Sequence, residues 1–357
     1  MATYAQAVRM ALYYGETHLG LQHIFGQDVG PPLGGVFTAT QGLTTAWNSP
    51  LDERGIIGAA MGLSLAGIRC VAEIQFCDYI FNTIDLLKLA GNTCWSSNNG
   101  WNLPMTVMTP VGSGIRGASY HSHSFDATAT HIPGWKIVMP SNPKDAYGLM
   151  LSCLKEMNPT FFLMPKSLIY LRGDESIAGE PPLTAEGQKQ LCQMINKPIQ
   201  SEEAIPWEPQ WPSALKDESI EIGKGKIVRE GSDLTVVSYG RTLPLCCKAA
   251  DLLGSEASIE VIDLRSLWPY DWNLISNSIL KTKTALYVNE DTEITNFGEH
   301  LLRRTIEEHF YDLLAPPQLL AGAFIPGIGL AHELEMASVP QLQDIKTAME
   351  KILQTKL

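Results

Sequence analysis

The chain has 357 residues, of which 45% are hydrophobic and 18% are charged, with a formal net charge of −12. This composition excludes a disordered chain, and the acidic balance argues against nucleic acid and membranes as partners, because both attract basic surfaces. The length predicts two domains, and no apolar stretch reaches the roughly 18 residues of a membrane-spanning helix.

The first 172 residues alternate between helical and strand patterns. Apolar spacing predicts helices over 4–14, 54–66, 78–90 and 144–156. Short apolar runs between them predict strands over 68–76, 104–109, 135–139 and 160–164. Strands that alternate with helices indicate a parallel sheet covered on both faces.

The alternation stops over residues 173–221, which hold six prolines and ten acidic residues against three lysines. We predict that this segment is an acidic, proline-rich linker. A solvated loop explains its charge, and a docking surface for a basic partner is the alternative.

The alternation resumes over 222–357. Strands are predicted over 234–238, 258–263 and 284–289, and helices over 243–253, 297–313 and 339–353. The predicted fold class is therefore α/β, with one parallel-sheet domain over 1–172 and a second, smaller one over 222–357.

Seven cysteines occur and none forms Cys-x-x-Cys, which indicates free thiols rather than a disulfide framework or a zinc knuckle. The first residues show no secretory signal or transit peptide. We therefore expect a cytoplasmic protein rather than a mitochondrial or plastid one.

Residues 112–117 fit the pattern G-x-G-x-x-G after a predicted strand. In a nicotinamide-dependent oxidoreductase, a helix would open at the third glycine and an acidic residue would follow about 20 positions on. Neither is present, so a loop whose backbone closely approaches another group is the competing interpretation.

Three histidines, His121, His123 and His131, follow this loop, with Asp126 between them. Such a cluster could bind zinc, or it could form hydrogen bonds and contact a substrate.

Asp52 and Glu53 stand at the start of a predicted helix rich in glycine and alanine. Acidic residues there are stabilised by the helix dipole, which requires no function. The small residues also permit close packing against a partner, which would bury a carboxylate and make it a proton-handling group.

Taken in order, several segments resemble one family, the β subunits of thiamine-diphosphate-dependent 2-oxo acid dehydrogenases of the branched-chain and pyruvate types. The matching segments are 26–30 (GQDVG), 34–37 (GGVF), 50–55 (PLDERG), 72–80 (AEIQFCDYI), 102–105 (NLPM), 120–122 (YHS), 131–134 (HIPG), 230–233 (EGSD) and 260–265 (EVIDLR). The resemblance spans the chain and implies a transketolase-like pyrimidine-binding domain followed by a transketolase C-terminal-like domain.

The resemblance also implies site residues. Glu53 matches the glutamate that contacts a ring nitrogen of the cofactor's aminopyrimidine, and Leu51, Gln75 and Tyr79 match positions that line the pyrimidine pocket. His121 matches a histidine that faces the reacting centre, where it would help to protonate or orient the intermediate and assist acyl transfer to a lipoyl group.

Some family members hold a structural potassium ion, mostly through backbone carbonyls. The resemblance places this site at Met105, Cys153, Leu154, Glu156 and Asn158. An ordinary helix C-terminus is the alternative explanation of the same residues.

The chain has no Gly-Asp-Gly followed by asparagine, the motif with which the family's α chain holds magnesium and diphosphate. The resemblance therefore implies a heterotetramer of two α and two β chains, acting on a branched-chain 2-oxo acid or pyruvate and delivering acyl groups to a lipoyl acyltransferase core. Gln27, Met108 and Asn289 depart from the usual Glu, Arg and His. A non-catalytic interaction subunit of the same fold is the second hypothesis, and a nicotinamide-dependent oxidoreductase is the third.

Overall fold

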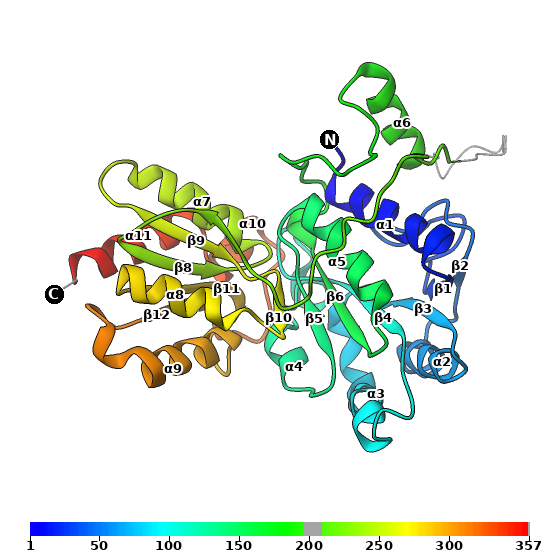
Figure 1. Ribbon diagram of the computed structural model, residues 1–357, viewed down its shortest axis with the longest axis horizontal. Helices are drawn as coiled ribbons and strands as arrows, with labels where there is room; N and C mark the ends of the chain where they lie inside the picture. Colours follow the sequence, from blue (N-terminus) through cyan, green and yellow to red (C-terminus); the bar gives the residue numbers. More distant parts are fainter. Residues whose placement is uncertain (196–208, 356–357) are drawn as a thin grey trace. The chain divides into compact units, whose positions relative to one another are not determined.

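The computed structural model describes residues 1–195 and 209–355. Its chain forms two compact units (Figure 1), of which the first comprises Met1–Pro110, Ile132–Met164 and Leu168–Glu221, and the second Val111–His131, Pro165–Ser167 and Ile222–Leu357. Within the described residues, every helix is too short or too polar to cross a bilayer.

The first unit is built on a sheet whose strands run in the order β5-β6-β4-β3-β1-β2. The pairs β1–β2, β1–β3, β3–β4 and β5–β6 are parallel. Every residue of β4 and β6 is buried, as expected for strands covered on both faces. The strands are β1 (Leu21–Gly26), β2 (Ala46–Asn48), β3 (Arg69–Glu73), β4 (Met105–Val111), β5 (Lys136–Val138) and β6 (Thr160–Pro165).

Helices α1 and α5 lie on one side of this sheet, and α2 and α3 lie on the other (Figure 1). Helix α1 begins with a capping box in which Thr3 and Gln6 exchange side-chain and backbone hydrogen bonds. The helices are α1 (Tyr4–His18), α2 (Glu53–Leu65), α3 (Ile84–Ser96), α5 (Pro143–Lys155) and α6 (Ala185–Ile195).

The helix predicted over 78–90 is wrong in its first half. A 3-10 helix, η1 (Cys77–Thr83), precedes α3. The Thr83 hydroxyl donates to the Ile80 carbonyl at 2.6 Å, which closes the last turn of η1 and leaves α3 to begin at Ile84.

The segment predicted as a linker groups with the first unit over its described residues, and it contains α6. Trp211 stacks on Tyr13 of α1, with ring centroids 4.3 Å apart, and the Tyr147 hydroxyl of α5 donates to the Lys216 carbonyl at 2.7 Å. Aromatic stacking and backbone hydrogen bonds thus hold a segment whose composition indicated solvation. Residues 196–208 lie outside the described part of the chain.

The second unit has a sheet in the order β12-β11-β8-β9-β7, in which β7 is antiparallel to β9 and the other pairs are parallel. The prediction of a parallel sheet is therefore correct except at this edge. The strands of this unit are β7 (Lys226–Arg229), β8 (Leu234–Ser238), β9 (Ile259–Asp263), β10 (Ser266–Trp268), β11 (Ala285–Thr292) and β12 (Gln318–Gly322).

Helices α7 and α11 cover one face of the second sheet, and α8 and α9 lie on the opposite side (Figure 1). Cys246 and Ala250 of α7 and Ile345 and Met349 of α11 belong to one buried apolar cluster with the strands. The helical segments are α4 (Asp126–Thr130), α7 (Thr242–Leu253), α8 (Trp272–Thr282), α9 (Phe297–His309), α10 (His332–Ser338), α11 (Leu342–Gln354), and the 3-10 turns η2 (Ala118–Tyr120) and η4 (Phe310–Asp312).

Candidate functional site

Glu53 is the first residue of α2 and its side chain is half-buried, whereas Asp52 is exposed. Asp52 makes no capping hydrogen bond; its carboxylate lies against Gly55, where a Cβ would come within 2.7 Å of Oδ2. The helix dipole stabilises a carboxylate in the first turn by about 0.3–1 kcal/mol. Because Asp52 is exposed and Glu53 is half-buried, Glu53 is the more shielded of the two carboxylates at this helix start.

Tyr79, in η1, lies close enough to Glu53 for their charges to interact. Burial, the charge of Asp78 and the charge of Glu53 all raise the pKa of the Tyr79 hydroxyl. Leu51 is 71% exposed. The carboxylate and the phenol are thus within reach of each other's charge, and an exposed apolar side chain, Leu51, lies two residues before Glu53.

Gln75 follows strand β3 and connects it to the loop after β1. Its amide donates to the Gln27 carbonyl at 3.2 Å and to the Asp28 carboxylate at 3.0 Å. Since Gln27 participates through its backbone, the replacement of the family's usual glutamate at this position leaves this contact unchanged.

Glu73, the last residue of β3, is a buried acid that the sequence analysis did not single out. Burial raises the pKa of its carboxyl group to about 8. The carboxyl lies beneath Gly35, where a Cβ would come within 3.2 Å of Oε1. Its signal in the sequence is an acidic residue ending an apolar strand, two positions before Gln75.

The glycine loop 112–117 belongs to the second unit, and two buried glutamates hold it. Glu290 of β11 accepts from the Ser113 N–H at 3.1 Å and from the Ser113 hydroxyl at 2.7 Å. Glu335 of α10 accepts from the N–H groups of Gly114 at 2.8 Å and Arg116 at 3.0 Å. The side chain of Glu290 is 8% exposed, and Glu335 is 4% exposed.

These contacts decide between the two interpretations of the loop. Backbone N–H groups of a glycine-rich loop bind phosphate when they point at an open site. Here the carboxylates of Glu290 and Glu335 already occupy the N–H groups of Ser113, Gly114 and Arg116. The loop therefore does not fit a nicotinamide dinucleotide, and its glycines serve close backbone approach instead.

His121 is half-buried at the end of this loop. Its Nδ1 lies 3.1 Å from the Gly117 carbonyl oxygen. Because a carbonyl only accepts hydrogen bonds, this contact assigns the proton of the neutral ring to Nδ1 and the lone pair to Nε2. Gly117 has no room for a side chain, since a Cβ would lie 2.6 Å from the His121 carbonyl oxygen.

The zinc hypothesis for His121, His123 and His131 gains no support. Within residues 1–195 and 209–355, no three His, Cys, Asp or Glu side chains converge in a way that could hold a metal ion.

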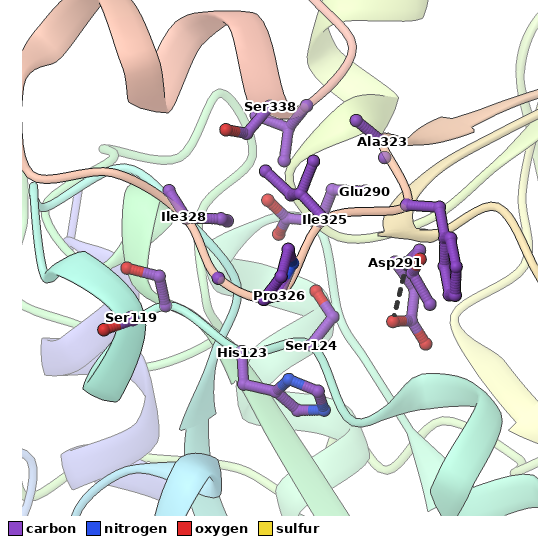
Figure 2. A pocket seen from close by; sticks show the side chains of 16 residues that line it. Ser119, His123, Ser124, Glu290, Asp291, Ala323, Ile325, Pro326, Ile328 and Ser338 are labelled. Carbon is purple, nitrogen blue, oxygen red and sulfur yellow. Dashed lines mark hydrogen bonds between the residues drawn. The ribbon is translucent and has the colours of Figure 1, made fainter.

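A cavity of about 190 Å³ lies beside the loop in the second unit. Figure 2 shows side chains from residues 119–124, from β11 and from the segment after β12 around it. Apolar residues of the segment 323–328 face serines and carboxylates. The residues labelled in Figure 2 are Ser119, His123, Ser124, Glu290, Asp291, Ala323, Ile325, Pro326, Ile328 and Ser338.

Two of the acids that line this cavity, Glu290 and Asp291, belong to an acidic cluster with the buried Asp126. Burial and the charges of Asp291 and Glu290 raise the pKa of the Asp126 carboxyl well above its usual range. The Asp291 carboxylate accepts from the Ala127 N–H at 3.0 Å, which ties β11 to helix α4.

Two of the departures from the family pattern have a structural explanation. Asn289 and Asn296 exchange amide hydrogen bonds of 2.7 and 2.9 Å, so a buried pair of asparagines replaces the usual histidine. Met108 is fully buried in β4, where it contributes an apolar side chain to the core.

Protein side chains contact several residues of the expected potassium site. Arg69 of β3 donates to the backbone carbonyls of Leu154 and Glu156. The Glu156 carboxylate pairs with Lys136 at 2.5 Å, and the Cys153 carbonyl accepts from the Glu156 N–H at 3.2 Å. Of the five residues predicted to hold potassium (Met105, Cys153, Leu154, Glu156 and Asn158), three therefore have oxygens that already accept from protein donors: Cys153, Leu154 and Glu156.

The two units match known domains. Residues 2–171 match the transketolase pyrimidine binding domain, and residues 223–345 match the transketolase C-terminal domain. A solved structure described as a split gene transketolase, an inactive β4 tetramer, has a TM-score of 0.71 at 17% identity and covers 100% of both chains. That likeness shows the fold alone.

Full-length relatives are more specific. The chain is 35% identical over 340 residues to the 2-oxoisovalerate dehydrogenase subunit beta of Pseudomonas aeruginosa, covering 93% of this chain and 89% of that protein. It is 31% identical over 358 residues to the protein of the same name from Bacillus subtilis, covering 98% of each. It is also 31% identical over 341 residues to the pyruvate dehydrogenase E1 component subunit beta of Acholeplasma laidlawii, covering 93% and 92%.

The paired domains define a protein of the transketolase class. Within that class, the chain belongs to the family of β subunits of the thiamine-diphosphate-dependent 2-oxo acid dehydrogenases, which confirms the resemblance seen in the sequence.

Proposed function

We propose that the chain is the β subunit of a decarboxylating component that oxidatively decarboxylates a branched-chain 2-oxo acid or pyruvate and passes the acyl group to a lipoyl domain. The names of the relatives support the reaction class. The observation that carries the proposal is the shielded carboxylate of Glu53 at the start of α2, close to Tyr79.

The residues around Glu53 fit the pyrimidine end of thiamine diphosphate. A half-buried carboxylate can accept a hydrogen bond or a proton at a ring nitrogen, while Tyr79 and the exposed Leu51 offer surfaces that orient a flat ring and exclude water. Gln75 adds a neutral hydrogen-bonding group. When bound, the cofactor supplies the carbon nucleophile for the 2-oxo group and the sink for the electron pair released on decarboxylation.

His121 would hold and deliver a proton at Nε2, since its Nδ1 is engaged by the Gly117 carbonyl. An imidazole suits this work because its ordinary pKa lies near neutral pH. In the proposed reaction, His121 protonates or orients the intermediate and assists transfer of the acyl group.

The exposed face of α2 supports an α-chain partner. Gly58, Ala59 and Gly62 are exposed on this helix, and a Cβ on either glycine would meet no atom within 4 Å. Leu51 and Leu65, at the two ends of the face, are 71% and 53% exposed. A flat face of small residues flanked by leucines allows a second chain to approach closely and to complete the shielding of Glu53.

The remaining parts of the proposal follow from the family. The assembly would contain two α and two β chains, with magnesium held by the α chain, and it would dock on a lipoyl acyltransferase core in the cytoplasm. The acidic residues of 173–221 and the second unit would favour encounter with a basic binding domain of that core.

The experiment is co-expression with an α chain, followed by assays of a panel of 2-oxo acids with thiamine diphosphate and magnesium. Glu53→Gln should lower kcat by about 100-fold or more, because a proton-sharing carboxylate is lost. Asp52→Asn is the matched control: it removes the neighbouring exposed carboxylate and should leave kcat within about twofold.

A non-catalytic interaction subunit is the second candidate, and the departures at Met108 and Asn289 favour it. Glu53 and His121 are both present, which favours catalysis. A stable complex with the α chain that binds no cofactor and decarboxylates no 2-oxo acid would establish the interaction role instead.

A further inference from the structure

The end of helix α5 is held by an arginine from the neighbouring strand. The last carbonyls of a helix have no partner within the helix and must find one elsewhere. Arg69, the first residue of β3, donates from Nη1 to the Leu154 carbonyl and, at 3.0 Å, to the Glu156 carbonyl. A positive charge at a helix C-terminus also complements the helix dipole.

A second cation completes the arrangement. Lys136, the first residue of β5, pairs through Nζ with the Glu156 carboxylate at 2.5 Å. The Glu156 N–H donates to the Cys153 carbonyl at 3.2 Å. The Leu154, Glu156 and Cys153 carbonyls and the Glu156 carboxylate therefore all have protein donors. Among the described residues, only the Asn158 Oδ1 of this group is buried without a hydrogen-bond partner.

These contacts use oxygens that a monovalent ion would need. A potassium ion bound by backbone oxygens needs several of them directed at one point, because they must replace its hydration shell. Two carbonyls are turned to Arg69, one carboxylate is turned to Lys136, and Asn158 Oδ1 is the side-chain oxygen that remains in this segment. Two positive side chains would also repel a third cation at this distance.

We propose that the guanidinium of Arg69 is a built-in replacement for the structural potassium ion, so that this chain needs no monovalent cation to fix the end of α5 to β3. The inference concerns the folded chain and does not depend on the reaction proposed above. It goes beyond that function because it concerns whether the folded chain needs potassium, and it attributes the answer to one side chain, that of Arg69.

The neighbourhood of Arg69 predicts what its removal would do. Arg69 lines a cavity of about 330 Å³ together with Ser64, Trp101 and Met157. Replacing the guanidinium with an apolar side chain would free the Leu154 and Glu156 carbonyls next to this cavity. The variant chain would then offer potassium the oxygens that the native chain withholds.

The test is thermal unfolding of the full chain, in the assembly in which it purifies, in potassium chloride and in choline chloride at equal ionic strength. The native chain should give the same Tm within about 1 °C in both salts. Arg69→Met, which keeps the apolar stem, should lower Tm by about 5 °C in choline, and potassium should restore part of the loss. Lys155→Met removes an exposed charge from the same helical turn and should cost no more than about 2 °C in either salt.

Two results would overturn the inference: a native Tm that rises by several degrees with potassium but not with choline, or an Arg69→Met chain that unfolds at the native temperature. If Arg69→Met gives no folded chain, Arg69→Lys retains the charge but loses the fork of N–H donors, and an intermediate Tm is expected. The native chain's response to the two salts requires no variant.

Discussion

The carboxylate of Glu290 occupies the space beside Gly112 that a side chain would need: a Cβ on Gly112 would lie 2.0 Å from Oε1 of Glu290. The carboxylate cannot easily withdraw, because Ser113 donates to it twice and Arg241 lies 3.9 Å away. Gly112 also has a φ of +79°, in the region that side chains disfavour. Steric and conformational reasons thus both require glycine here.

Gly112→Ala should therefore lower the free energy of unfolding by about 3 kcal/mol, combining backbone strain with displacement of a buried carboxylate. Gly67→Ala is the matched control, since Gly67 has a φ of +80° and no atom within 4 Å of the added Cβ. It should show only the strain, about 1–2 kcal/mol. If urea unfolding gives the same loss of unfolding free energy for both variants, the Glu290 carboxylate moves aside without an energetic cost.

Glu335 should position the loop that carries His121. Glu335→Ala leaves the N–H groups of Gly114 and Arg116 without their acceptor, so the backbone amides of 112–117 should exchange with solvent faster and kcat should fall by about 10-fold or more. Glu335→Gln keeps an acceptor oxygen and should be intermediate. Glu333→Ala, at an exposed site on the same helix, should match the native chain in both measurements.

Unchanged amide exchange in Glu335→Ala would contradict this role. A loss of stability without a change in kcat per folded molecule would mean that Glu335 supports only the fold.

Glu73 should make stability depend on pH. Burial raises the pKa of its carboxyl from 4.5 to about 8, so the folded chain keeps a proton that the unfolded chain releases between these values. The free energy of unfolding should therefore fall as pH rises from 5 to 8, by at most about 1.4 kcal/mol per pH unit. Glu73→Gln mimics the protonated form and should lack this contribution.

The measurement is the urea midpoint of both chains at several pH values, since other carboxyl groups contribute equally to each and cancel in the difference. Parallel curves would show that Glu73 is already ionised in the folded chain at pH 5.

His121→Ala should lower the overall rate by about 100-fold or more, as expected for loss of a positioned general acid or base. Transfer of the acyl group to a lipoyl domain should suffer more than decarboxylation followed with an artificial electron acceptor. His332→Ala, on the exposed start of α10, is the control and should leave both rates unchanged. Equal rates for the His121 variant and the native enzyme would remove His121 from the mechanism.

The fold was predictable wherever local pattern and tertiary environment agree. The fully buried strands β4, β6 and β8 appeared as short apolar runs, and α5 and α7 appeared at helical spacing. Strands β1 and β2 were not predicted, because polar side chains such as Gln22 and Asn48 interrupt their apolar pattern. Helix α6 was missed because prolines and acidic residues on either side of it indicated a linker.

The candidate site was predictable only in its local part. The sequence indicates Glu53 because an acidic residue stands at the start of a predicted helix, and it indicates His121 because a histidine follows a glycine-rich loop. The partners of that loop, Glu290 and Glu335, lie 177 and 221 residues further along the chain from Ser113 and Gly114, and no local pattern connects them. Arg69 likewise lies 85 and 87 residues from Leu154 and Glu156, whose carbonyls it contacts, so no local pattern predicted these contacts.

The second unit combines chain segments that are synthesised at different times, because they lie far apart in the sequence. Residues 111–131, which carry His121, are made early, between strands of the first unit, yet they belong to a body completed by residues 222–357. Glu335, the acceptor for Gly114 and Arg116, follows them by 221 and 219 residues. During translation, the histidine loop must therefore wait until Glu335 has emerged from the ribosome, and a chain that stops before Glu335 lacks this acceptor.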